Sequence, residues 1–161
     1  MRAVLDYCTG GDQKRFSAGE LLVREGERTG RLYVLIDGQV EVVKGGTVVA
    51  SVAEPGAMFG EMSILLGRDH SADVRAATPS TIYVIGDAAA FLRDRPALVL
   101  LIAQLLARRL SMATSYLADI KRQYAGHGNH LAMVGDLLQS MINLPPAEVE
   151  PGSDLQSDPR I

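Results

Sequence analysis

The sequence has few of the residues on which several classes of protein depend. Cys8 is the only cysteine, which excludes a disulfide framework within the chain. Lys and Arg number 16 against 19 Asp and Glu, and the resulting net charge of −3 provides no broad positive field to recruit nucleic acid or acidic lipid. With only three histidines, the chain has little material for an imidazole-rich metal site.

Long hydrophobic runs are missing as well. The N-terminal stretch MRAVLDYCTGG has no apolar core of signal-peptide length. The most apolar run, PALVLLIAQLLARRL, begins at Pro96 and reaches Arg108 and Arg109 too early to span a bilayer. We therefore expect a cytoplasmic protein with no membrane partner, in which 161 residues form one domain with an appended helical element.

Short β-branched runs separated by turn residues fill the chain from Arg15 to Ile85. The run RLYVLIDGQVEVV is interrupted by Asp37-Gly38, and VEVVKGGTVVASV contains Gly45-Gly46; both pairs are hairpin signals. The stretch SADVRAATPSTIYVIG supplies two more strand-like runs. Closely spaced strands of this kind predict a mainly β, α+β fold built on an antiparallel roll or jelly roll.

After Gly86 the apolar residues follow a helical period. Asp87 is a candidate N-cap for a short helix that ends near Pro96, and helix formers dominate from Pro96 to Tyr124. The first part of this long helix carries a broad apolar stripe expected to pack on the roll, made of Leu98, Leu101, Ile102 and Leu105. Further along this helix, apolar residues spaced alternately four and three positions apart form one continuous seam, made of Leu106, Leu110, Ala113, Leu117, Ile120 and Tyr124. This 106–124 seam predicts a homodimer.

By composition the chain divides into three parts. Residues 1–86 hold an N-terminal helical segment and the roll, and residues 87–144 hold C-terminal helices, which we expect to form the dimerisation surface and, by the family resemblance described below, a lid. Residues 145–161 are rich in Pro, Ser, Asp and Glu and are predicted to be disordered.

The stretch FGEMSILLGRDHSADVRA, called here the 59–76 segment, has the chemistry of an anion site. If Gly60–Ser63 opens a helical turn between strands, its first backbone N–H groups are unpaired and can bind an anion. Gly60 lets the backbone approach a ligand, and Glu61 can accept hydrogen bonds from a hydroxyl pair such as a ribose edge. Ser71 and the amide of Ala72 would add donors, which together describe a sugar phosphate. A G-E-x-S tetrapeptide is common, however, and by itself also fits a turn without a ligand.

The 59–76 segment resembles the phosphate-binding cassette of cyclic nucleotide-binding domains, whose usual form is F-G-E-x-(A/S)-L-L-x-G-x-x-R-(S/T/A)-A-(T/S)-V-x-A. The stretch EGERTGRLYVLIDGQVEV is similar to the early strands of that family, with Gly26 and Gly38 at its turn glycines. The family includes catabolite activators, kinase regulatory subunits and gated channels. The resemblance implies an eight-stranded antiparallel β-roll (a jelly roll, or double-stranded β-helix) with a short cassette helix, a long C-terminal helix, and cAMP or cGMP as ligand.

The resemblance also assigns roles to residues. It implies that Gly60 and Glu61 hold the ribose 2′-OH, and that the backbone amides of Met62 and Ser63 face the cyclic phosphate. The ligand-binding candidates are Phe59, Gly60, Glu61, Met62, Ser63, His70, Ser71 and Ala72, of which His70 differs from the residue usual in the family.

Two positions depart from the family pattern, since His70 replaces Arg and Asp73 replaces Thr or Ser. Arg has a permanent charge and a planar set of donors, whereas an unperturbed His is largely neutral near pH 7. Charged hydrogen bonds contribute about 1.5–3 kcal/mol each, so the change is expected to weaken nucleotide affinity by about one to three decades. Arg68 is a candidate substitute, with a surface role as the alternative. Asp73 could pair with Arg68 or Arg75, or add repulsion.

The purine contact is placed on the long helix. The stretch ARRLSMATSYL looks like the catabolite activator helix in which adjacent hydroxyl residues meet the adenine, so Thr114 and Ser115 are the candidates. A solvated position on the helix surface is the alternative for both residues.

No catalytic apparatus is expected. His127 and His130 have a spacing that could ligate a metal, but a loop before a helix fits them better, and Cys8 has no evident partner. Direct DNA binding is disfavoured because the residues after Tyr124 contain one Arg, Arg160, and no Lys. We therefore predict that the protein is not an enzyme and has no metal and no cofactor.

The function predicted from the sequence is a stand-alone cyclic nucleotide-binding regulatory module that signals through an unknown effector protein. The alternative is a degenerate roll that binds no nucleotide and acts as a dimeric scaffold. A truncated transcription regulator is a third and weaker alternative. The first two hypotheses differ at His70.

Overall fold

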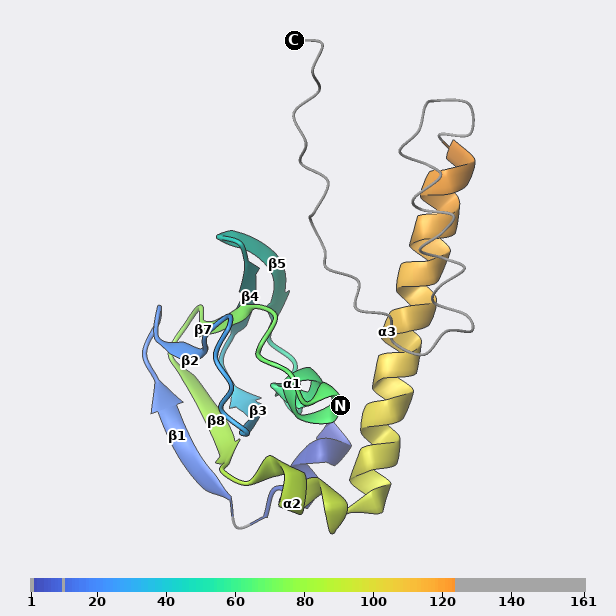
Figure 1. Ribbon diagram of the computed structural model, residues 1–161. Helices are drawn as coiled ribbons and strands as arrows, with labels where there is room; N and C mark the ends of the chain where they lie inside the picture. Colours follow the sequence, from blue (N-terminus) through green and yellow to red (C-terminus); the bar gives the residue numbers. More distant parts are fainter. Residues whose placement is uncertain (1, 10, 124–161) are drawn as a thin grey trace. The chain divides into compact units, whose positions relative to one another are not determined.

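The computed structural model describes residues 2–9 and 11–123 (Figure 1). In chain order the strands are β1 Asp12–Phe16, β2 Leu21–Val23, β3 Leu32–Asp37, β4 Val40–Lys44, β5 Thr47–Val52, β6 Met58–Phe59, β7 Asp73–Ala76 and β8 Ser80–Ile85. The helices are the 3-10 helix η1 Arg2–Tyr7 and the α-helices α1 Glu61–Leu66, α2 Ala88–Arg93 and α3 Pro96–Gln123.

Across these residues the eight strands form two four-stranded antiparallel sheets. One sheet has the order β1-β8-β3-β6, and the other has the order β2-β7-β4-β5. The predicted eight-stranded roll, with a short helix before β7 and a long helix after β8, is confirmed.

The Gly45-Gly46 hairpin is confirmed, but the hairpin predicted at Asp37-Gly38 is wrong. Lys44 faces Thr47 across the β4–β5 turn, whose glycines have φ of 53° and 81°, as a two-residue hairpin requires. Strand β3 instead pairs with β6 and β8, and β4 pairs with β5 and β7. Asp37-Gly38 is therefore a corner at which the chain changes sheets. The alternation of apolar residues shows where strands are, but it does not show which strands they pair with.

The corner at Gly38 leaves no room for a side chain. Gly38 has φ of 101°, and an added Cβ would lie 2.3 Å from Ser80 Oγ and 2.7 Å from Pro79 O. The buried Ser80 hydroxyl donates to Thr78 O at 2.7 Å and accepts from Gln39 N at 3.1 Å. The two places where the chain crosses between sheets, before β4 and before β8, thus pack directly against each other.

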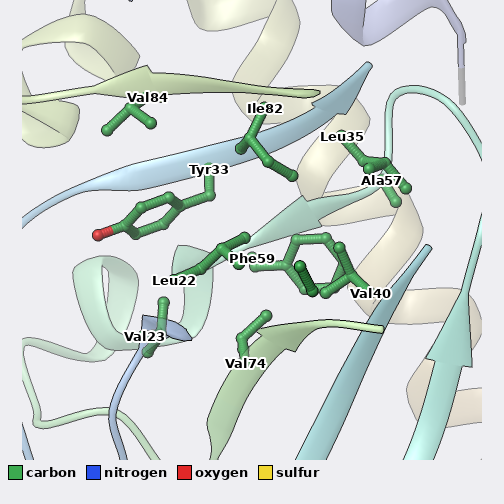
Figure 2. Close-up of a cluster of buried hydrophobic side chains, with 11 residues drawn as sticks. Leu22, Val23, Tyr33, Leu35, Val40, Ala57, Phe59, Val74, Ile82 and Val84 are labelled. Atoms are coloured by element: carbon green, nitrogen blue, oxygen red, sulfur yellow. The ribbon is translucent and has the colours of Figure 1, made fainter. Parts of the chain in front are cut away.

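The space between the sheets is filled by one apolar cluster (Figure 2). Its buried members are Leu22, Val23, Tyr33, Leu35, Val40, Ala57, Phe59, Val74, Ala76, Ile82 and Val84. In β3 the residues that alternate with Tyr33 and Leu35 are Leu32 and Val34, which are also fully buried. Strand β3 is therefore covered on both faces, and η1 contacts it outside the cluster.

The helices after β8 begin as the sequence predicts. The Asp87 side chain accepts a hydrogen bond from Ala90 N at 3.0 Å and so caps α2. α3 starts at Pro96, whose missing N–H costs nothing in a first turn. Leu98 and Ile102, from the broad stripe, are 0% and 1% exposed.

The chain forms two compact units, Met1–Gln104 and Leu105–Ile161. The predicted division at residues 86 and 87 stays a prediction. The helix expected before residue 144 and the tail 145–161 lie outside the described residues.

By length and composition alone, α3 could cross a membrane, with a mean hydropathy of 1.5 in its most apolar stretch. Mostly buried core helices of soluble proteins pass the same test, whereas only 11% of this stretch is buried in the structure, and Arg108 and Arg109 lie within α3. The absence of a membrane partner stays a prediction.

Gly38→Ala is expected to lower the free energy of unfolding by about 4 kcal/mol, because it combines a strained backbone with an overpacked corner. The measurement is urea unfolding followed by circular dichroism. Gly46→Ala is the matched control: its φ is 81° and nothing lies within 4 Å of the added Cβ, so it should cost only about 1 kcal/mol. Equal losses in the two variants would contradict the packing of the corner.

Candidate functional site

The short helix α1 joins β6 of one sheet to β7 of the other and carries the first half of the 59–76 segment. Gly60 precedes it with φ of 90°, and Gly67 ends it with φ of 63°. An added Cβ at Gly60 would lie 2.7 Å from Arg31 O. The position that a side chain would take at Gly60 is thus occupied by the backbone of the β2–β3 loop (residues 24–31), and the approach of a ligand to this glycine stays a prediction. At the other end, Ser63 O accepts from the Gly67 and Arg68 N–H groups.

The side chains of α1 divide into a buried pair and an exposed apolar set. Glu61 and Ser63 are 4% and 6% exposed, whereas Met62, Leu65 and Leu66 are about half exposed. Ser63 Oγ donates to Arg68 O at 2.5 Å, so this hydroxyl closes the turn after the helix. The first N–H groups of α1 have no partner within the helix, and its dipole adds partial positive charge there. The N–H groups of this first turn and the buried carboxylate of Glu61 are thus the groups that the sequence analysis expects to meet a ligand, and that role stays a prediction.

The β2–β3 loop (residues 24–31) lies beside the loop that follows α1. Strands β2 and β7 are neighbours in one sheet, and β3 and β6 are neighbours in the other, so both connections cross between the sheets at the same place. His70 N donates to Glu27 O, and Gly26 N donates to His70 O, both at 2.9 Å. These two hydrogen bonds join the connections directly.

His70 is buried, with 6% of its surface exposed. Its Nε2 lies 3.0 Å from Thr29 Oγ1, and its Cε1 would lie 3.7 Å from a Cβ added at Gly60. The imidazole is therefore next to Gly60, the residue that precedes α1 and to which the family resemblance assigns the ribose hydroxyl.

Burial lowers the pKa of His70 below 6.5, and the negative charges of Asp69 and Glu27 oppose this shift. The first effect is the larger, because a charged imidazolium loses its hydration in this position. His70 is thus neutral near pH 7 when no ligand is bound.

The rest of the loop after α1 is fixed by polar contacts. Lys44 Nζ donates to Ser71 O at 2.7 Å, and Glu25 N donates to Asp73 Oδ1 at 2.6 Å. Of the alternatives left open for Asp73, the pair with Arg75 does not form, because Arg75 instead binds Glu41 with two hydrogen bonds of 2.8 and 3.0 Å. The carboxylate of Asp73 therefore accepts a hydrogen bond from the backbone of the neighbouring β2–β3 loop and does not pair with Arg75.

The sequence reasoning missed the β2–β3 loop. Arg28 donates through its guanidinium to Gly67 O, and Thr29 contacts His70. The only signal available was the run EGERTG, with glycines at both ends and charges between them, which is equally typical of a surface turn.

The remaining candidates have varied surroundings. Phe59 packs in the apolar cluster and pairs with Tyr33 across β6 and β3. Ser71 is exposed and Ala72 is half-buried. Thr114 Oγ1 donates to Leu110 O at 2.8 Å within α3, and Ser115 is exposed; both belong to the second unit, and their contact with a purine stays a prediction.

Among residues 2–9 and 11–123 no group of three His, Cys, Asp or Glu side chains could hold a metal ion. His127 and His130 lie outside this part of the chain, so the metal spacing noted for them is not tested.

A sequence profile described as Cyclic nucleotide-binding domain matches residues 13–93, which are half of the chain. The protein belongs to this family. The matched region contains the whole 59–76 segment, so the motif and the roll around it point to the same family.

Individual relatives agree with this membership. A cAMP-dependent protein kinase regulatory subunit of Schizosaccharomyces pombe is 29% identical over 50% of this chain and 22% of its own length. An uncharacterized ABC transporter ATP-binding protein of Mycobacterium tuberculosis is 34% identical over 48% of this chain and 24% of its own. The chain thus spans about a quarter of the length of these relatives.

Among solved structures, the Thermus thermophilus catabolite activator protein has a TM-score of 0.59 at 22% identity, covering 91% of this chain and 88% of that one. A cyclic nucleotide-binding domain from Methylobacillus flagellatus has a TM-score of 0.56 at 26% identity, covering 73% and 69%. The first likeness shows the fold alone.

Acid is expected to destabilise the ligand-free protein through His70. Because the pKa of His70 is lower in the folded state, the unfolded chain binds more protons as the pH falls through about 6.5, and the stability contributed above that pH is lost. The measurement is the urea midpoint at pH about 7.5 and about 5.5, for the parent and for His70→Gln. The glutamine variant should lose less stability between the two pH values. Identical losses would show that the imidazole does not titrate differently on folding.

Proposed function

We propose that the chain is a stand-alone regulatory module that binds cAMP or cGMP at the 59–76 segment and signals through an effector protein. The observation that carries this proposal is the first turn of α1, where Gly60, the buried Glu61 and the imidazole of His70 come together. A cyclic nucleotide has one anionic diester and one free ribose hydroxyl close to it. The turn offers N–H donors for the first and a carboxylate acceptor for the second.

His70 would take the position of a permanent cation. A bound diester favours the imidazolium, so its binding and the protonation of His70 are linked. Since burial holds the ligand-free imidazole neutral, the nucleotide has to bring the pKa up, and part of its binding free energy is used for that.

Relatives support the ligand class without choosing the purine. Their names include a cAMP-dependent kinase regulatory subunit and a cGMP-dependent protein kinase of Caenorhabditis elegans, the latter 30% identical over 45% of this chain. In this proposal the protein is a cytoplasmic module without catalytic activity or DNA binding. The hydroxyl residues Thr114 and Ser115 of the long helix would contact the base of the nucleotide. Binding would shift the population between two packings of the helices that follow the roll.

The second candidate function is a dimeric scaffold that binds no nucleotide. One observation favours it: His70 is already buried, neutral and hydrogen-bonded to Thr29, which is what a purely structural imidazole would also do.

Nucleotide affinity separates the two functions. If His70 binds the diester as imidazolium, the affinity for cAMP or cGMP rises by up to about tenfold per pH unit as the pH falls from about 8 to about 6. His70→Arg should bind about 10- to 1000-fold more tightly and with little pH dependence, because its charge and bidentate geometry are permanent. The measurement is isothermal titration calorimetry in buffers of different ionisation enthalpy, which also counts the protons taken up.

His70→Gln is the matched control, since it keeps a donor without a titratable group. It should bind weakly and equally at both pH values. Absence of heat with either nucleotide at millimolar concentration, at both pH values and in folded protein, would favour the scaffold.

We further propose that α3 forms a homodimer through the 106–124 seam. Leu110 is 47% exposed, and Leu106, Leu117 and Ile120 are half-buried, so within α3 this stripe is not enclosed. Apolar residues at this spacing pack well against a second helix.

Leu110→Lys should shift the protein to monomer, because it places a charge in the apolar seam. The measurement is sedimentation velocity over a range of concentrations. Ser111→Lys is the matched control: it adds the same charge at an adjacent exposed position outside the seam and should leave the dimer intact. A Leu110→Lys protein that sediments as the parent does would assign the stripe to packing within one chain.

A further inference from the structure

The hydroxyl of Thr29 has a defined set of hydrogen bonds. Its Oγ1 accepts from Arg31 N at 3.3 Å and lies 3.0 Å from His70 Nε2. A hydroxyl has one proton and two acceptor positions. With one acceptor position used by Arg31 N, Thr29 still has the proton and the second acceptor position for the imidazole. It can therefore donate to an unprotonated Nε2 or accept from a protonated one.

The position of the imidazole is fixed on several sides. The two backbone hydrogen bonds between His70 and Gly26–Glu27 hold its main chain, and Thr29 holds Nε2. Cε1, which lies between the two ring nitrogens, faces Gly60 at the start of α1. Nδ1 is consequently the nitrogen that is not bound to Thr29.

We propose that Thr29 is a positioning residue, whose hydroxyl engages Nε2 of His70 and thereby assigns Nδ1–H to the cyclic phosphate. This inference rests on the proposed function for the identity of the ligand, but the hydrogen bond on which it is built is present in the ligand-free protein. The cassette motif, which begins at Phe59, does not include this threonine.

The same hydroxyl serves both protonation states of the imidazole. In the neutral ring Thr29 donates its proton to Nε2, which places the ring proton on Nδ1. When a diester binds and the ring takes up a proton from solvent, that proton goes to Nε2. The Thr29 hydroxyl then rotates and accepts it, so no hydrogen bond is lost as the charge appears.

The charged groups around His70 are consistent with this switch. Glu27, in the β2–β3 loop, and Asp69, in the loop after α1, both favour the imidazolium, while burial opposes it. Tyr33 of β3 would also lie 3.7 Å from a Cβ added at Gly60, and Glu61 follows Gly60 in α1. Burial is the larger effect and lowers the pKa of His70, while the negative charges of Asp69 and Glu27 reduce that lowering.

The first test is nuclear magnetic resonance of the ligand-free protein. Long-range ¹H–¹⁵N spectra at pH about 8 report which ring nitrogen carries the proton, and the His70→Gln variant assigns the signal among the three histidines. We expect the parent to hold the Nδ1–H tautomer, Thr29→Ser to keep it, and Thr29→Val to shift toward the Nε2–H form that a free imidazole prefers. A parent protein whose His70 carries its proton on Nε2 overturns the inference. If the valine variant does not fold, the spectrum of the parent is sufficient to test the inference.

The second test is calorimetry with cAMP and cGMP. Thr29→Val should bind about tenfold more weakly than the parent and with an altered pH profile, whereas Thr29→Ser should stay within about twofold. Equal affinity and pH profile in the parent and the valine variant overturn the positioning role. If the tautomer responds as expected but no variant binds nucleotide, the hydrogen bond to Thr29 stands while the proposed function fails.

Discussion

The site depends on the pair of backbone hydrogen bonds between His70 and the Gly26–Glu27 turn. They join two connections that each cross from one sheet to the other, and they determine where the imidazole can lie. Around them, Arg28 binds the end of α1 at Gly67, and Lys44 binds the carbonyl of Ser71. The first turn of α1 is therefore positioned by backbone and polar contacts at its far end as well as by Gly60 at its start. Backbone N–H groups depend on such positioning for any role in binding, because they cannot adjust as long side chains do.

The fold was largely predictable from the sequence because its signals are local. The Gly45-Gly46 turn, the Asp87 cap and the start of α3 at Pro96 each depend on a few adjacent residues, and each forms as predicted. The error at Asp37-Gly38 has the opposite cause. Whether a turn joins neighbours in one sheet or crosses to another depends on residues about 40 positions away, such as Ser80 against Gly38.

The candidate site likewise has a part that a local motif predicts and a part that depends on residues distant in the chain. The motif indicated the 59–76 segment and the departure at His70, because the pattern is long and continuous. It could not indicate Thr29, Glu27 or Arg28, which come from another part of the chain and carry no distinctive spacing. Nor could it indicate that the backbone of Arg31 lies where a side chain at residue 60 would be. Contacts between distant loops are the part of a site that a single sequence leaves unspecified.

The position of α1 has a mechanical consequence. Each of the two joined connections has one end in each sheet, so neither sheet alone supports the imidazole or the first turn of the helix. A force that displaces this turn is divided between four strands, β2, β3, β6 and β7. The roll therefore carries a load on this turn through both of its sheets at once.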